Sequence, residues 1–280
     1  MAEPLIDVWD VETFDPALTA CLAENTDLMA AYHARANTIF LDHDYGRART
    51  MIRPDNEYAS DYSDLRDTVS RLMDGRTIRA WHYTRLTDRE VDTLCRDGIH
   101  LSTPASLRGR LDAIVADGQL TAAETDVLWA HNMFNHQHDS RAEKFWATSH
   151  PQRVDDSGVE PLMKHWGGEA ASMWMKDAAL LERLAGVSRA RFVGVAMPLA
   201  ACEHFYGAGQ AVMRAFARSR GAVCETSGFD LYARGALPAS AVLEIHTEGE
   251  ASFTSMAQGY PAAFVDHGLT HWKKLTGEDD

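Results

Sequence analysis

The chain has 280 residues, 45% of them hydrophobic and 24% charged, and a formal net charge of −14. This composition is ordinary for a soluble globular protein, whereas a general nucleic-acid binder needs more Lys and Arg for phosphate contacts. No apolar run reaches the ~18 residues of a membrane helix, and the acidic start has no signal-peptide pattern. We therefore expect a cytoplasmic protein without a membrane partner.

Residues 1–75 are predicted to be mostly helical. Leu65, Val69, Leu72 and Met73 form one helical stripe, which ends at Gly75. This pattern divides the chain into a helical N-terminal region (1–75), a core (76–250) and a C-terminal extension (251–280). The four cysteines lack the spacing of a metal site and are expected to be reduced thiols.

Residues 79–85 read Arg-Ala-Trp-His-Tyr-Thr-Arg and predict a strand that ends in polar side chains. A helix is expected directly after this strand, with Thr87 or Asp88 as its N-cap and Gly98 at its end. Residues 99–103 predict a second short strand, which contains Ser102. A strand–helix–strand unit gathers polar groups at one edge of a sheet, where ligands commonly bind.

The stretch up to residue 130 predicts two helices that are separated at Gly118, and the second begins with the capping box Thr121-Ala-Ala-Glu124. Three histidines follow, and their imidazoles are of the kind that hold zinc or another divalent ion: His131, His136 and His138. Because no carboxylate stands at a familiar spacing, we interpret this segment as a polar loop and predict no metal. A hydrolase or a metal-dependent enzyme that uses these histidines stays as a third hypothesis.

The second half of the chain alternates strands and helices. Residues 144–150 predict a strand with a polar exit, and residues 170–184 predict a helix after the glycine pair at 167–168. The remaining predicted elements are a central strand at 191–198, a helix at 208–220, a strand or loop at 222–228, a strand at 229–233 and a strand at 241–246. Together these elements predict an α+β protein.

This order of elements resembles the ADP-ribosyltransferase superfamily, which includes enzymes with a His-Tyr-Glu triad and bacterial toxins that modify nucleic acid. The resemblance rests on the strand with His82-x-Thr84, the helix after it, the aromatic strand with Trp146, and the acid before a strand and a Pro turn. It covers residues 78–248. It implies an α+β fold of small, split antiparallel sheets with helical insertions, and NAD in the cleft between the sheets.

The resemblance also implies roles for individual residues. His82 would bind the adenosine-side ribose, and Trp146 or Tyr83 would stack on nicotinamide. Asp230 would bind a hydroxyl of the nicotinamide ribose and stabilise the positive charge of the transition state, with Glu225 as the nearby alternative. The other polar residues of the expected NAD-binding set are Thr84, Ser102 and Ser149.

The implied function is NAD-dependent transfer of ADP-ribose to a protein, nucleic-acid or small-molecule acceptor with release of nicotinamide, as in a toxin or an antiviral-defence effector. NAD is the implied substrate, and an antitoxin is an implied partner. The usual acid of the family is Glu, whereas this chain has Asp230. The second hypothesis is therefore a non-catalytic ligand- or partner-binding α+β protein with a cleft lined by Trp81, Trp146 and Trp166. The chain has no glycine-rich dinucleotide motif, which disfavours a Rossmann oxidoreductase.

Overall fold

The computed structural model describes residues 5–45 and 52–259, and these residues form an α+β fold, as predicted. The strands are β1 (Leu5–Ile6), β2 (Thr77–Leu86), β3 (Phe145–Thr148), β4 (Arg189–Pro198), β5 (Cys202–Glu203), β6 (Asp230–Ala233) and β7 (Val242–Thr247). The α-helices are α1 (Pro16–Glu24), α2 (Thr26–Ile39), α3 (Ala59–Met73), α4 (Asp88–Asp97), α5 (Pro104–Ala116), α6 (Ala122–Ala130), α7 (Phe134–Arg141), α8 (Glu160–Lys164), α9 (Gly168–Ser172), α10 (Ala178–Gly186), α11 (Ala208–Ser219) and α12 (Ala251–Met256). The predicted C-terminal extension is described only as far as residue 259, and the rest of it lies outside the described residues.

All seven strands belong to one sheet, in the order β5-β6-β3-β2-β4-β7, and β1 pairs with β2 beside this path. The pairing of β1 with β2 is parallel, and the other strand pairs are antiparallel. The long strand β2 is therefore at the centre, with β4 on one side and β3 on the other. Of the helices in the described ranges, none is both long and apolar enough to span a bilayer.

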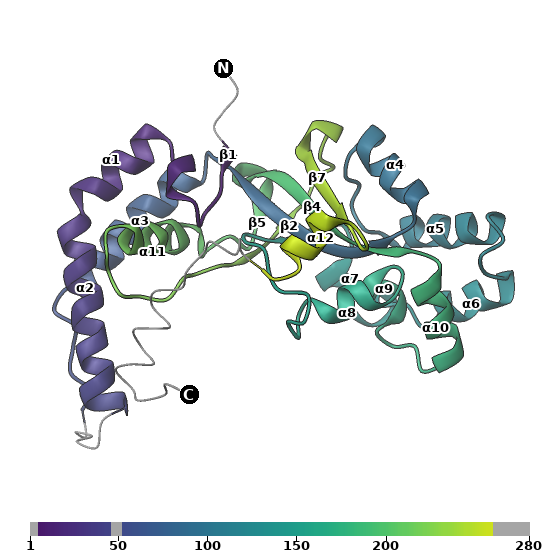
Figure 1. Cartoon of the computed structure of the whole chain (residues 1–280), viewed down its shortest axis with the longest axis horizontal. Coiled ribbons are helices and arrows are strands. Elements are labelled where there is room, and N and C mark those ends of the chain that lie inside the picture. The colour runs from purple at the N-terminus through teal and green to yellow at the C-terminus, as the bar shows by residue number, and fades with distance from the viewer. Residues whose placement is uncertain (1–4, 46–51, 260–280) are drawn as a thin grey trace.

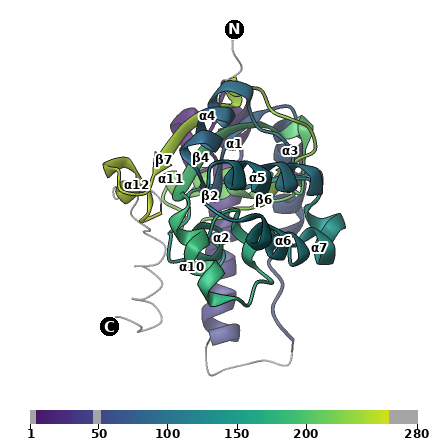
Figure 2. The ribbon, with the colours of Figure 1, turned by 90° about the vertical axis from the view of Figure 1, so that its right-hand side faces the viewer.

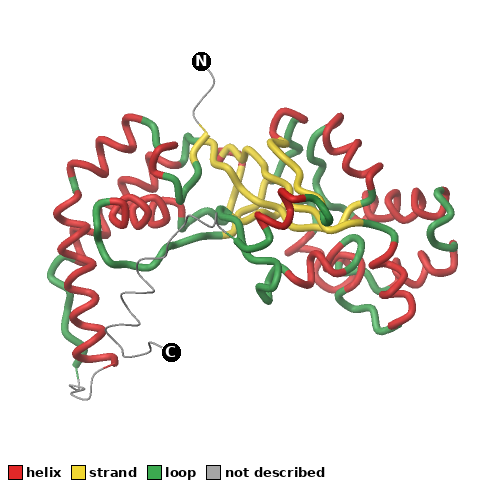
Figure 3. The backbone as a smooth tube through the Cα atoms, in the orientation of Figure 1, coloured by secondary structure: helices red, strands yellow, loops and turns green. Residues whose placement is uncertain are grey.

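Helices lie at both ends of the sheet, which separates two helical groups (Figure 1, Figure 3). Helices α1, α2, α3 and α11 pack together at one end, and their buried side chains share one core with Ile78, Val195 and Leu231 of the sheet. The N-terminal region thus contributes to the core of the sheet, and its Ile6 pairs directly with β2.

The helices at the opposite end, turned toward the viewer in Figure 2, form a second core of their own. This core contains the buried side chains of Leu111 (α5), Leu128 (α6) and Leu184 (α10), and also Trp166, which lies between α8 and α9. A third, smaller core lies on one face of the sheet, where Tyr83 and Phe192 pack with residues of α8 and α12. These helical insertions enclose the space beside the central strand.

Local signals account for the predicted helix ends. Thr87 caps α4 and forms a reciprocal capping box with Glu90, and Thr121 does the same with Glu124 at the start of α6. Gly98 ends α4 at φ 85°, a backbone conformation that suits glycine.

Two predicted elements differ in the structure. Residues 99–103 do not form a strand, because Ile99 bridges to Leu237 and Ser102 bridges to Lys144, and two single bridges to different partners make no ladder. The helix expected over 170–184 is two helices, α9 and α10. It is interrupted because the Asp177 side chain accepts hydrogen bonds from the backbone of Ala179 and Leu180 and so begins a new helix.

Candidate functional site

The central strand β2 is paired very unequally with its two neighbours. Ten residue pairs join β2 to β4, from Thr77↔Pro198 to Leu86↔Arg189. Only the pair Trp81↔Thr148 joins β2 to β3, although β3 itself pairs with β6 over its full length. The sheet therefore consists of two halves, β5-β6-β3 and β2-β4-β7, which are connected by one residue pair and separate beyond it.

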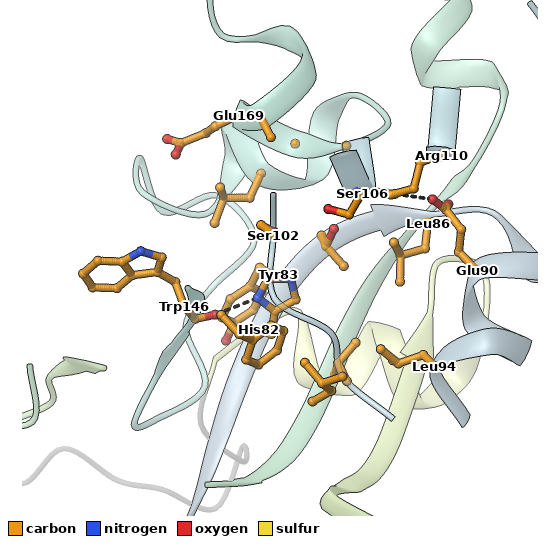
Figure 4. A pocket seen from close by; sticks show the side chains of 18 of the residues that line it. His82, Tyr83, Leu86, Glu90, Leu94, Ser102, Ser106, Arg110, Trp146 and Glu169 are labelled. Atoms are coloured by element: carbon orange, nitrogen blue, oxygen red, sulfur yellow. Dashed lines mark hydrogen bonds and ion pairs between the residues drawn. The ribbon is translucent and has the colours of Figure 1, made fainter. Parts of the chain in front are cut away.

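His82 lies where the two halves separate. Its Nδ1 is 2.8 Å from the carbonyl oxygen of Trp146 on β3, and its ring packs against Phe145 at 4.5 Å between centroids (Figure 4). A carbonyl only accepts hydrogen bonds, so Nδ1 carries the proton and donates. Burial lowers the pKa of His82 to about 4; the hydrogen bond to Trp146 opposes this shift and the charge of Arg110 adds to it. At neutral pH the imidazole is thus uncharged, and its Nε2 is an acceptor.

A cavity of about 740 Å³ opens at this separation, between the sheet and the helical insertions. A volume of this size suits a small-molecule ligand. Of the residues predicted for the site, six line it, from three different strands and one loop: His82, Tyr83, Thr84, Ser102, Trp146 and Asp230. Glu225 and Ser149 do not line it.

The six lining residues differ in how far they are available to a ligand. Thr84 is buried on the same face of β2 as His82, and Ser102 is exposed opposite Lys144. The Tyr83 hydroxyl is engaged by the backbone of Gln152, and burial raises the pKa of Tyr83. Tyr83 therefore belongs to the core of the sheet through its ring and is less suited to stack on a ligand.

Asp230 is the first residue of β6 and is exposed. Neighbouring groups nevertheless remove water from its carboxyl group, and this burial raises its pKa, while nearby His204 opposes the shift. Pairing opposite Thr148 places Asp230 on the face of the sheet that bears Trp146, whereas His82 lies on the other face. His82 and Asp230 nevertheless both line the same cavity.

Ser149 and Glu225 have other positions. The Ser149 hydroxyl accepts a hydrogen bond of 3.0 Å from the backbone N–H of Phe229, and the Ser149 N–H donates to the Phe229 carbonyl at 2.9 Å. Ser149 thus fixes the chain directly before Asp230 and acts on the site through it. Glu225 is exposed in the loop that precedes β6, outside the cavity. Of the two candidate acids, the cavity contains only Asp230.

Several charged residues of the cavity were not predicted. Three ion pairs lie in its wall: Arg110–Glu90 at 2.6 Å, Arg141–Glu169 at 2.8 Å and Arg89–Asp117 at 3.2 Å. Burial raises the pKa of Glu90, but the charge of Arg110 and the hydrogen bonds to Glu90 outweigh it, and the net shift is downward. Glu90 was visible in the sequence only as an acidic residue in the first turn of the helix that Thr87 caps. The pairing of Glu90 with Arg110, 20 residues away, has no local signal.

The tryptophan cleft is present only in part. Trp81 and Trp146 line the cavity, but Trp166 is fully buried behind it. The Trp166 indole N–H donates to Glu90 at 3.0 Å, and the Arg110 guanidinium lies 4.6 Å above the ring. Trp166 therefore holds the ion pair of the wall in place and is not available to a ligand.

The three histidines of the α6–α7 segment do not form a metal site. Within residues 5–45 and 52–259, no group of three or more His, Cys, Asp or Glu side chains is placed to hold an ion. His131 bonds to the carbonyl of Val127, and His136 packs against Trp174. The segment is not the predicted loop, however, because His136 and His138 lie on helix α7 and His131 is the residue that ends α6.

Comparison with protein families, with curated proteins and with solved structures gave no match to this chain in any of the three. A functional proposal therefore depends on the residues of this cavity.

Proposed function

We propose that the chain is an NAD-dependent ADP-ribosyltransferase whose NAD occupies the cavity between β2 and β3. One observation carries the proposal: His82, Trp146 and Asp230, which come from three neighbouring strands, line one cavity at the separation of the sheet. The separation into two antiparallel halves supports the split-sheet fold that the resemblance implies.

The state of His82 suits the role of a ribose-binding residue. The Trp146 carbonyl fixes the tautomer, so Nε2 can accept a hydrogen bond from a ribose hydroxyl. Because the ring is neutral at pH 7, it recognises the hydroxyl without adding charge beside the sugar. Binding at this position holds one end of the dinucleotide against the central strand.

Asp230 suits the role of the acid beside the reacting sugar. When the bond between nicotinamide and ribose breaks, its electron pair leaves with nicotinamide and positive charge develops on the sugar. A fixed carboxylate near that charge stabilises the transition state. The hydrogen bonds between Ser149 and Phe229 hold the backbone directly before Asp230, which limits the movement of the carboxylate. The acceptor then attacks the sugar carbon and loses a proton.

A non-catalytic ligand-binding protein is the second candidate. It is favoured by the side chain at position 230, which is one methylene shorter than the Glu of the family, and by Trp81 and Trp146 in the cavity wall. Both candidates predict that a ligand enters the same cavity, and only the first predicts release of nicotinamide.

Calorimetric titration with NAD, followed by measurement of released nicotinamide, separates the candidates. Wild-type protein is compared with His82→Ala, in which binding should weaken, and with Glu225→Ala, a matched control outside the cavity. Binding with release supports the transferase, and binding without release supports the non-catalytic protein. If wild-type protein and His82→Ala bind NAD equally or not at all, the placement of NAD is wrong.

A further inference from the structure

The candidate acid Asp230 follows a loop without regular secondary structure, residues 222–229. Asp230 is the first residue of β6, so the strand does not fix the residues before it. The position of its carboxylate therefore depends on what holds the end of the loop, residues 227–229. Ser149 holds Phe229 by two hydrogen bonds, and a second set of contacts comes from the N-terminal region of the chain.

Trp9 provides these contacts together with His150. The Trp9 indole N–H donates to the Ser227 carbonyl at 2.8 Å, although the two residues are 218 positions apart in the chain. The Trp9 ring stacks on the His150 ring, with centroids 4.4 Å apart and an angle of 25° between the planes. His150 in turn lies directly on Gly228, where an added Cβ would be 1.9 Å from the His150 Cε1. We name Trp9 and His150 the loop clamp.

The loop clamp is anchored to the sheet through both of its residues. His150 comes two positions after the end of β3, and its Nδ1 is 3.3 Å from the Ser149 hydroxyl. Trp9 comes shortly after β1, which pairs with β2, and its backbone N–H donates to the Asp7 carboxylate at 3.0 Å. Because β2 and β3 border the cavity, the loop clamp fixes the loop relative to the cavity itself.

The two residues of the loop clamp act from outside the cavity. Neither Trp9 nor His150 lines it, whereas Asp230 does. Burial lowers the pKa of His150 to about 4, against the opposing charge of Asp156, so the ring is neutral at pH 7. It therefore packs between Trp9 and Gly228 without burying a charge. Any effect of the loop clamp on a bound ligand must pass through the loop that ends at Asp230.

We propose that Trp9 and His150 are positioning residues that hold the Asp230 carboxylate beside the reacting sugar. This role rests on the proposed function. A carboxylate stabilises the developing positive charge only while it stays close to it, and a displacement of about 1 Å can lower a rate by about 100-fold. The N-terminal region, which carries no chemistry of its own, is thereby connected to the candidate acid through Trp9.

The first test compares NAD affinity, measured by calorimetry, with the rate of nicotinamide release under saturating NAD. In Trp9→Ala the rate should fall about 10- to 100-fold, while the dissociation constant of NAD changes by about twofold or less. Trp9→Phe keeps a stacking ring but loses the bond to Ser227, so its rate should fall less, by about 3- to 10-fold. Trp9→Phe also serves as the test variant if Trp9→Ala does not fold, as judged by circular dichroism.

Trp174→Ala is the matched control. Trp174 also packs against a histidine ring, that of His136, and it does not line the cavity. Its replacement should therefore leave both the rate and the NAD affinity at the wild-type values.

The second test needs no turnover. Burial raises the pKa of Asp230, with His204 opposing the shift. Once the loop is no longer held, water reaches the carboxylate, so the pKa of Asp230 should fall toward its ordinary value in Trp9→Ala and stay unchanged in Trp174→Ala. NMR titration of protein with carboxyl-labelled aspartate measures this pKa, and Asp230→Asn assigns the resonance.

The two tests separate this proposal from the transferase proposal. If the wild-type protein releases no nicotinamide, the transferase proposal fails by itself, and the titration alone decides whether the loop clamp holds the acid. An Asp230 pKa that is the same in wild-type protein and Trp9→Ala overturns the loop clamp. It is also overturned if the wild-type protein is active and Trp9→Ala keeps the wild-type rate, or if NAD affinity falls as much as the rate, which would indicate a general disturbance of the cavity.

Discussion

Replacement of Asp230 by Asn is the most direct test of the site, because it removes one charge and keeps the size of the side chain. Two unit charges ~4 Å apart interact by about 4 kcal/mol at an effective dielectric constant of about 20. Asp230 is exposed, so solvent screens it, and we expect a loss of about 2–3 kcal/mol of transition-state stabilisation. This corresponds to a rate of nicotinamide release that is about 30- to 150-fold lower.

The assay measures nicotinamide release under saturating NAD, with Glu225→Gln as the control, because Glu225 is an exposed acid close in sequence but outside the cavity. Circular dichroism of each variant confirms that the fold is retained. Since Asp230 acts on the charged transition state, NAD affinity should change much less than the rate. The reasoning is refuted if Asp230→Asn turns over NAD at the wild-type rate, or if Glu225→Gln loses as much activity.

Three further predictions concern stability. Gly98→Ala should lower the free energy of unfolding by about 3 kcal/mol or more, since Gly98 has φ 85° and a Cβ there would lie 2.2 Å from the Leu237 carbonyl oxygen. Gly118→Ala, at φ 69° in open space, should cost only about 1 kcal/mol, and equal losses in urea titrations would contradict the argument. Arg76→Ala breaks a largely buried ion pair with Asp15 and should lower the free energy of unfolding by about 3 kcal/mol. Arg153→Ala breaks an exposed pair with Asp155 and should lower it by less than about 1 kcal/mol. Similar urea midpoints for the two variants would refute this prediction. Burial lowers the pKa of His33, His82 and His150 from 6.5 to about 4. As the pH falls, these histidines are therefore protonated in the unfolded chain before they are protonated in the folded protein. The free energy of unfolding should drop between pH 6.5 and 4 by at most about 1.4 kcal/mol per pH unit for each histidine. A flat unfolding free energy over this range would show that these rings protonate equally well in the folded protein.

The sequence predicted those elements whose signals are local. The N-cap at Thr87, which was one of two candidates, the capping box at Thr121 and the amphipathic helix α11 occur close to where their patterns place them. The strand that contains His82 was also recognisable, but β2 continues to Leu86, so His82 lies within the strand and not at its end. Such signals depend on residues that are neighbours in the chain, and a single sequence contains them in full.

The parts of the site that were missed depend on residues far apart in the chain. Trp166 was expected in the cleft, but its indole N–H bonds to Glu90, which is 76 residues away. Residues 99–103 have the composition of a strand, yet their bridges go to two separate partners. The gap between β2 and β3 results from the packing of whole elements, and no pattern within either strand indicates it.

The separation of β2 and β3 also affects how strongly a side-chain substitution can weaken ligand binding. Beyond Trp81↔Thr148, the facing edges of the two strands have no ladder between them, so peptide N–H and C=O groups border the cavity directly. The Trp146 carbonyl already bonds to the His82 side chain in this way. Peptide groups are present whatever side chain the residue bears. A ligand held partly by these edges would therefore tolerate substitution along β3, and related chains could keep the same ligand while their sequences diverge.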